Sequence, residues 1–113
     1  MSDNCLFCKI IKGQIPAAKL YEDEEVMAFA DINPQAPTHF LVIPKVHLTG
    51  PSAVTEAEQS LIGKVMRVGA EIARERGVDS FRFVVNNGAA AGQTVFHYHL
   101  HVLGGRSLAW PPG

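Results

Sequence analysis

The stretch Phe96-His97-Tyr98-His99-Leu100-His101-Val102 alternates apolar and imidazole side chains, one residue at a time. Alternation with a period of two is typical of a β-strand, because successive side chains of a strand point to opposite faces of its sheet. We therefore predict a strand over Thr94–Leu103 with its apolar residues facing the core. The imidazoles of His97, His99 and His101 are then expected on one face, about 7 Å apart, whereas a helix would turn His99 away from the other two.

Four further strands are predicted upstream, at Lys19–Glu22, Glu25–Ala30, His39–Pro44 and Phe81–Asn86. Several connections between successive strands are too short to hold a crossover helix, so neighbouring strands are expected to run antiparallel. The segment Asp31–Pro37, which contains two prolines, has the composition of a turn. The sequence thus predicts an α+β fold with a mainly antiparallel, five-stranded sheet, one long helix and one short helix.

The long helix is expected over Glu56–Arg76, where apolar residues recur on one face and charged residues on the other. Thr55 and Glu58 form a capping-box pattern at its start, and Gly77 provides the stop. The short helix is expected over Cys5–Lys12. Its capping residue is predicted to be Asp3 or Asn4.

The composition describes one small globular domain, residues 1–113, with 47% apolar and 19% charged residues. The 10 basic and 11 acidic side chains give a formal net charge of −1, which leaves no basic excess to bind a nucleic-acid polymer. No apolar run approaches the ~20 residues needed to span a membrane. Residues Met1–Asn4 lack the basic region and apolar core of a signal peptide, so a cytoplasmic, reducing location is expected.

A row of imidazoles suits either metal ligation or phosphate chemistry, and a polar solvent-facing surface is the simplest alternative. Two histidines on a strand plus a third ligand can hold a catalytic zinc. Equally, one neutral histidine can attack phosphorus while its neighbours hold the phosphate oxygens. The preceding loop contains glycines that let backbone N–H groups approach an anion, and Asn86, Gln93 and Thr94 add side-chain donors. A phosphate site where this loop meets the strand is therefore favoured.

Together these residues resemble the histidine triad (HIT) superfamily, whose signature of histidines separated by apolar residues fits His97–Leu103. The following Gly104-Gly105-Arg106 and the ending Trp110–Gly113 are similar to the Hint branch, the histidine triad nucleotide-binding proteins. Gly104 stands where the dinucleoside-polyphosphate hydrolase branch usually has proline. The similarity spans essentially the whole chain, including Phe7–Ile11, Ile15–Pro16, Phe29–Asp31 and Pro34–Phe40.

The resemblance implies hydrolysis of purine nucleoside 5′-phosphoramidates, in which the P–N bond is cleaved through a covalent nucleotidyl-histidine intermediate. AMP or GMP and an amine are released, and no cofactor is required for catalysis. His99 matches the nucleophile, and the other implied catalytic residues are His39, Thr94, His97 and His101. The implied nucleotide-binding residues are Asp31 at the ribose hydroxyls, Phe7, Ile10 and Phe29 around the base, and Asn86, Gly92, Gln93 and Trp110.

Cys5 and Cys8 form a C-x-x-C pair, which offers half of the four ligands that a structural zinc requires. His47 and His97 are the remaining histidines, and some bacterial relatives of the resembled family hold zinc with such a set. The alternative is that the two cysteines are small buried residues of a short helix. A thioredoxin-like role is not expected, because the pair does not follow a strand in a βαβ unit.

The resemblance also implies a homodimer in which the sheets of two subunits continue into one another. The C-terminal residues would reach towards the partner's site, where Trp110 would influence the preference for the leaving group. Two other functions remain open. One is a nucleotide-binding regulator with little turnover, and the other is a metal-dependent hydrolase that uses His97, His99 and His101 as ligands.

Overall fold

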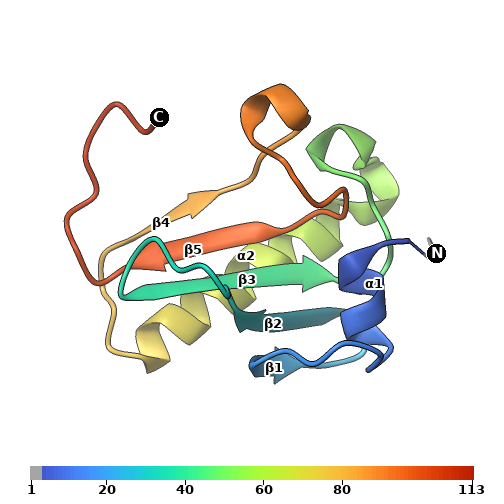
Figure 1. Ribbon diagram of the computed structural model, residues 1–113, viewed down its shortest axis with the longest axis horizontal. Helices are drawn as coiled ribbons and strands as arrows, with labels where there is room; N and C mark the ends of the chain where they lie inside the picture. Colours follow the sequence, from blue (N-terminus) through green and yellow to red (C-terminus); the bar gives the residue numbers. More distant parts are fainter. Residues whose placement is uncertain (1–3) are drawn as a thin grey trace.

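The computed structural model describes residues 4–113 and contains a five-stranded sheet (Figure 1). Its strands are β1 (Lys19–Glu22), β2 (Val26–Ala30), β3 (Thr38–Pro44), β4 (Phe81–Val84) and β5 (Leu100–Gly104). They lie in the order β1-β2-β3-β5-β4, and all neighbours are antiparallel. Helix α2 (Gln59–Glu75) covers one face, and the short helix α1 (Leu6–Ile11) lies over one end of the other (Figure 1). The predicted α+β fold is therefore confirmed.

The alternation of side chains along β2 and β3 divides the interior into two cores. Between the sheet and α2 the buried residues are Val26, Ala28, Phe40, Val42, Val65, Val68, Ile72, Ala73, Tyr98, Leu100 and Val102. Under α1 the buried residues are Cys5, Phe7, Cys8, Met27, Phe29, Leu41 and Ile43. Because β2 and β3 are covered on both faces, they form a rigid centre, and polar residues near their ends are held in fixed positions.

Helix α2 approaches β5 closely because Gly69 faces that strand. A Cβ atom at Gly69 would lie 3.2 Å from Cγ2 of Val102 and 3.3 Å from Cδ2 of Leu100, which is tighter than ordinary van der Waals contact. The absence of a side chain at this position therefore sets how near the helix lies to the strand that carries His101.

The starts of both helices show how far the capping signals hold. The capping box of Thr55 and Glu58 is present as predicted, although the first turn is a 3-10 turn and α2 itself begins at Gln59. At α1 the predicted cap is wrong: Cys5 is the N-cap, and its Sγ accepts a hydrogen bond from the N–H of Cys8 at 3.3 Å. Asn4 lies in an exposed turn, and Asp3 lies outside the described residues. Within residues 4–113, neither helix has the length and apolar character needed to cross a membrane.

The predicted histidine strand is shorter than expected, because β5 begins only at Leu100. Its pairing with β3 ends at the Leu100–Val42 pair. Beyond that point Nε2 of His97 donates a hydrogen bond to the carbonyl oxygen of Pro44, and the N–H of Tyr98 donates to the carbonyl of Leu48. These bonds replace the strand ladder, so residues 94–99 form an irregular segment and Phe96, predicted to face the core, is 48% exposed.

Candidate active site

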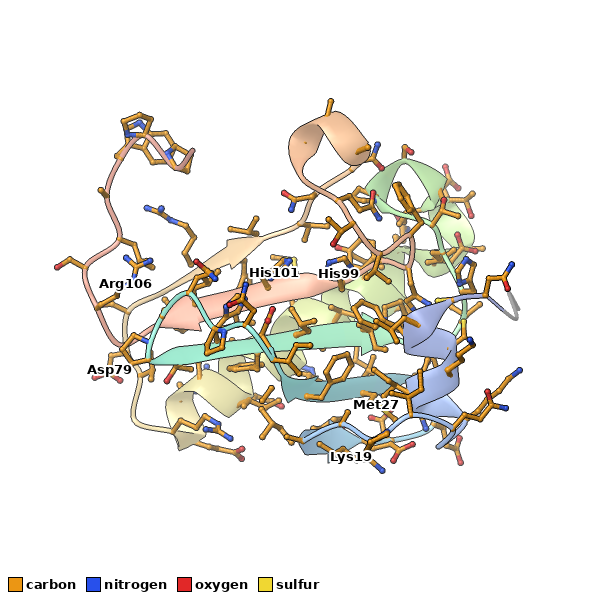
Figure 2. The ribbon with its side chains drawn as sticks, in the orientation of Figure 1. Lys19, Met27, Asp79, His99, His101 and Arg106 are labelled. Carbon is orange, nitrogen blue, oxygen red and sulfur yellow. The ribbon has the colours of Figure 1, made fainter. Side chains whose placement is uncertain are left out.

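Three imidazoles gather on the face of the sheet that carries α1. His39 of β3 and His101 of β5 have ring centroids 5.2 Å apart, and His99 lies 5.0 Å from His101. Figure 2 shows His99 and His101 next to each other along β5 and the segment that leads into it. His97 does not join this row, since its fully buried ring lies in a separate cluster. His97 still lies on the face that carries α1, as predicted, because its ring contacts Cys5 and Cys8 and lies 6.0 Å from the ring of Phe7.

A pocket of about 310 Å³ opens beside His99 and His101. It is lined by Leu6, Phe7, Ile10, Ile15, Pro16, Ala17, Phe29, Ala30, Asp31, Ile32, Leu41, Thr94, Val95, His99 and His101. The ring of Phe7 stands edge-on to two of these neighbours, with centroids 5.4 Å from Phe29 and 5.1 Å from His99. The pocket thus joins an apolar wall to a polar corner, the combination that is usual for small-molecule sites.

The structure brings together about half of the residues singled out in the sequence. Those that line the pocket are Phe7, Ile10, Phe29, Asp31, Thr94, His99 and His101. His39 is placed behind His101 and contacts it directly. Asn86 and Gly92 lie outside the lining, and Trp110 is 81% exposed in the C-terminal tail.

The loop before the histidines is held by its own hydrogen bonds. Gln93 is 4% exposed, and its amide is occupied by three backbone groups: the N–H of Gly88 and the carbonyls of Thr49 and Val95. Further backbone N–H groups, those of Ala91, Gly92 and Gln93, donate to carbonyls inside the loop. These groups shape the loop and are not open to an anion, so Thr94 is the residue of this loop that reaches the pocket.

Sequence reasoning missed the rest of the apolar wall, which consists of Leu6, Ile15, Pro16, Ala17, Ala30, Ile32, Leu41 and Val95. For Leu41 a signal existed, because it follows His39 by two residues on a strand and so shares its face. Ile32 is 99% exposed at the rim, and no periodicity marks it because it lies in a turn.

His99 is held in one tautomer by the backbone. Its Nδ1 lies 2.7 Å from the carbonyl oxygen of His97, and a carbonyl oxygen can only accept. The proton of the neutral ring is therefore on Nδ1, and Nε2 carries a lone pair. Burial lowers the pKa of His99, opposed by this hydrogen bond and by the charge of Asp31. The ring is thus neutral and nucleophilic near pH 7.

The other two imidazoles are also held neutral. Burial lowers the pKa of His101 to about 4, helped by the neighbouring His99 and His39. Burial also lowers the pKa of His39, against the opposing charge of Asp31. Oδ2 of Asp31 lies 3.3 Å from Nε2 of His39, and Oδ1 accepts the N–H of Asn33 at 2.8 Å. Asp31 therefore supplies the negative charge of a site whose histidines are uncharged.

A second cluster joins α1 to the end of β3 and consists of Cys5, Cys8, His47 and His97. The measured separations are 3.3 Å for Cys5 Sγ to His97 Nδ1, 3.3 Å for Cys8 Sγ to His47 Nδ1, and 3.2 Å between the two Nδ1 atoms. Ligands of a tetrahedral zinc with two sulfur and two nitrogen atoms lie about 3.3–3.8 Å apart. Nε2 of His97 bonds the carbonyl oxygen of Pro44 at 2.8 Å, which leaves Nδ1 unprotonated and facing the thiols. The four residues therefore fit a structural zinc ion.

Comparison with known proteins matches residues 12–108 to the HIT domain. The chain is 52% identical over its whole length to an uncharacterised HIT-like protein of Synechocystis, which it covers completely. It is 49% identical, over 96% of its length and 87% of the relative's, to a 14 kDa zinc-binding protein of Zea mays. Among solved structures, a HIT family hydrolase of Legionella pneumophila superimposes with a TM-score of 0.95 at 45% identity, covering 97% of this chain and all of that one.

Proposed function

The chain belongs to the HIT family, and from that premise we propose that it is a Hint-type hydrolase that cleaves the P–N bond of purine nucleoside 5′-phosphoramidates. The observation that carries the proposal is the hydrogen bond from Nδ1 of His99 to the carbonyl of His97, which leaves a lone pair on Nε2 at the pocket. The Legionella relative described as a HIT family hydrolase supports hydrolysis as the reaction class.

The proposed reaction has two displacements at phosphorus. In the first, the lone pair on Nε2 of His99 attacks phosphorus, the P–N bond to the amine breaks, and the amine leaves with an added proton. In the second, water attacks phosphorus and gives a proton back to the group that protonated the amine, the bond to His99 breaks, and the nucleoside monophosphate is released. Two hydrogen-bond donors that line the pocket, the imidazole of His101 and the hydroxyl of Thr94, are the candidates for protonating the leaving amine.

The pocket gives each part of a nucleotide a matching surface. Phe7, Ile10 and Phe29 offer an apolar, partly aromatic wall for a purine base. Asp31 can accept hydrogen bonds from both ribose hydroxyls, since a carboxylate has several acceptor sites. The neutral histidines then face the phosphate, where a carboxylate would repel it.

We further propose that Cys5, Cys8, His47 and His97 hold a structural zinc, in keeping with the name of the Zea mays relative. The ion would fix α1 to the end of β3 and hold His97, whose carbonyl orients His99. The alternative of a metal-dependent hydrolase is not supported, because the ring of His97 faces the thiols and not the other two histidines. A regulator with little turnover would use the same pocket, so turnover distinguishes it.

The deciding experiment measures release of AMP from adenosine 5′-phosphoramidate by the wild-type protein and by His99→Ala, with EDTA present throughout. Turnover by the wild type alone, with an acid-labile adduct of AMP mass on His99, is expected. AMP binding by His99→Ala serves as the control that the pocket is intact. Binding without turnover in the wild type would favour the regulator, and turnover that requires a metal ion besides the structural zinc at Cys5 and Cys8 would contradict the mechanism.

A further inference from the structure

The carbonyl oxygen of Gln35 accepts two hydrogen bonds from Arg106, which follows the last strand of the sheet. Nε and Nη2 of Arg106 both donate to this oxygen, at 3.1 Å and 3.0 Å, while Nη1 donates to the carbonyl of Ser107 at 2.8 Å. Figure 2 shows Arg106 just beyond the end of β5, away from His99. The turn that brings it there uses Gly105, with φ +89°, where a Cβ would lie 3.0 Å from Pro37. The carbonyl oxygen of Gln35 is therefore held by two hydrogen bonds from one guanidinium group, which fixes the position of this residue.

The N–H of the same residue, in the peptide group on the other side of its Cα, determines the tautomer of His39. The N–H of Gln35 donates to Nδ1 of His39 at 3.0 Å. A backbone N–H can only donate, so Nδ1 of His39 is an acceptor and the proton of the neutral ring is on Nε2.

The tautomer of His39 in turn determines that of His101. Nε2 of His39 lies 2.9 Å from Nδ1 of His101, with Oδ2 of Asp31 next to both at 3.3 Å and 3.9 Å. Because Nε2 of His39 carries a proton, it donates a hydrogen bond to Nδ1 of His101. Nδ1 of His101 is therefore unprotonated, and the proton of this neutral ring is on Nε2. That nitrogen is on the opposite side of a ring that lines the pocket.

We propose that Arg106 is a positioning residue that acts through Gln35 and His39 to present Nε2–H of His101 as a hydrogen-bond donor to the phosphate group of the substrate. The two neighbouring imidazoles then have opposite tautomers. His99 is protonated on Nδ1 and offers a lone pair, while His101 is protonated on Nε2 and offers a proton. The role in binding phosphate rests on the proposed function, but the tautomers do not.

The test is the ring ¹⁵N spectrum of the full chain at pH 7.5, where long-range ¹H–¹⁵N correlations distinguish a protonated from an unprotonated ring nitrogen. For the wild type we expect His39 and His101 as Nε2–H tautomers and His99 as the Nδ1–H tautomer. In Arg106→Ala, His39 and His101 should become mixtures of tautomers, whereas His99 should be unchanged. Arg106→Lys keeps one donor and should restore part of the wild-type pattern.

The matched control is Arg82→Ala, because Arg82 also holds the C-terminal tail, through the carbonyl of Leu108, but does not touch Gln35. It should keep the wild-type tautomers. With adenosine 5′-phosphoramidate, Arg106→Ala should lower kcat about tenfold and leave KM within about twofold, as expected for a misplaced group. An Nδ1–H tautomer of His101 in the wild type would overturn the proposal, as would unchanged tautomers in Arg106→Ala. If the tautomers are as expected but the protein has no turnover, the positioning of His101 by Arg106 would be supported and the proposed hydrolase would be rejected.

Discussion

Residues with the same side chain have different chemistry here because their hydrogen-bond partners differ. His99 donates to a carbonyl, His39 accepts from an N–H, and His101 accepts from His39. The identity of the side chain does not determine these partners, because each partner is either a backbone group or a side chain on another strand. The functional difference between neighbouring imidazoles is therefore a property of the fold, and substitutions at the partners test it as directly as substitutions at the histidines.

Acid should destabilise the fold partly through His101. Its pKa is about 4 in the folded chain, where burial and the nearby His99 and His39 disfavour the charged ring and Asp31 opposes them. In the unfolded chain the pKa is about 6.5, so the unfolded state binds the proton first as the pH falls. Stability from this group is therefore present above about pH 6.5 and is lost towards pH 4, by up to a few kcal/mol.

The measurement is urea unfolding between pH 7.5 and pH 4.5, with zinc removed, for the wild type and His101→Gln. The free energy of unfolding of the wild type should decline more steeply over this range than that of the variant. Titrating groups that do not interact with His101 are present in both proteins and cancel in the comparison, so the difference reports His101 together with its coupling to His39, His99 and Asp31. Parallel curves would show that His101 titrates alike in the folded and unfolded states.

Asp31 should select ribonucleotides. In Asp31→Asn the side chain can still accept the N–H of Asn33, so the turn is kept, but the charge that would bind both ribose hydroxyls is lost. Hydrogen bonds to a charged group contribute about 1.5–3 kcal/mol, so AMP should bind about ten- to a hundredfold more weakly. Calorimetric titration with AMP and with 2′-deoxy-AMP checks this. Equal losses for both nucleotides would mean that Asp31 does not contact the ribose.

Among the elements, the strands and helices with clear periodicity could be predicted from the sequence, and the histidine segment only in part. The alternation of Leu100, His101 and Val102 belongs to β5, but the same alternation two residues earlier does not. The ladder stops there because Pro44 has no N–H and its carbonyl bonds the ring of His97. Such a bond joins residues 53 positions apart, and no local pattern contains it.

The zinc cluster should stabilise α1, which has only six residues and so cannot be stable by itself. We expect one zinc per chain in the wild type and none in the Cys5→Ser, Cys8→Ser double variant, measured by elemental analysis. The melting temperature of the double variant should be at least about 5 °C lower. His39→Asn, which removes a histidine outside the cluster, should keep its zinc. A double variant with unchanged melting temperature would contradict a structural role for the metal.

The close contact between α2 and β5 can be tested with two glycines of the same helix. At Gly69 a new side chain meets Val102 and Leu100, whereas at Gly63 nothing lies within 4 Å of a new Cβ. Gly69→Val should therefore be less stable than Gly63→Val by about 1–3 kcal/mol, the usual cost of overpacking a core. Both substitutions change helix propensity equally, so the difference in urea unfolding reports the contact. Equal stabilities would show that the strand can move away without cost.

For the whole molecule, a single sheet with one long helix on one face and one short helix on the other leaves some apolar surface exposed. Strand β4 is a sheet edge whose residues are all half-buried, and Met66 of α2 is 47% exposed. This is consistent with the homodimer implied by the HIT resemblance, in which the sheet would continue through β4. The active site, by contrast, lies on the other face near α1, so the pocket walls seen in the chain do not require the partner.

We therefore expect sedimentation equilibrium to give twice the chain mass for the wild type, and the chain mass for Met66→Glu, because a buried unpaired charge costs several kcal/mol. Truncation after Leu108 removes Trp110, which is 81% exposed and is not among the residues that line the pocket of its own chain. If the tail reaches the partner's site, truncation should change kcat/KM for bulky amine leaving groups by more than about threefold and leave AMP affinity unchanged. Met66→Glu should reproduce that change without truncation, since a monomer has no partner tail. An effect of truncation in the Met66→Glu monomer would instead mean that the tail acts within its own chain.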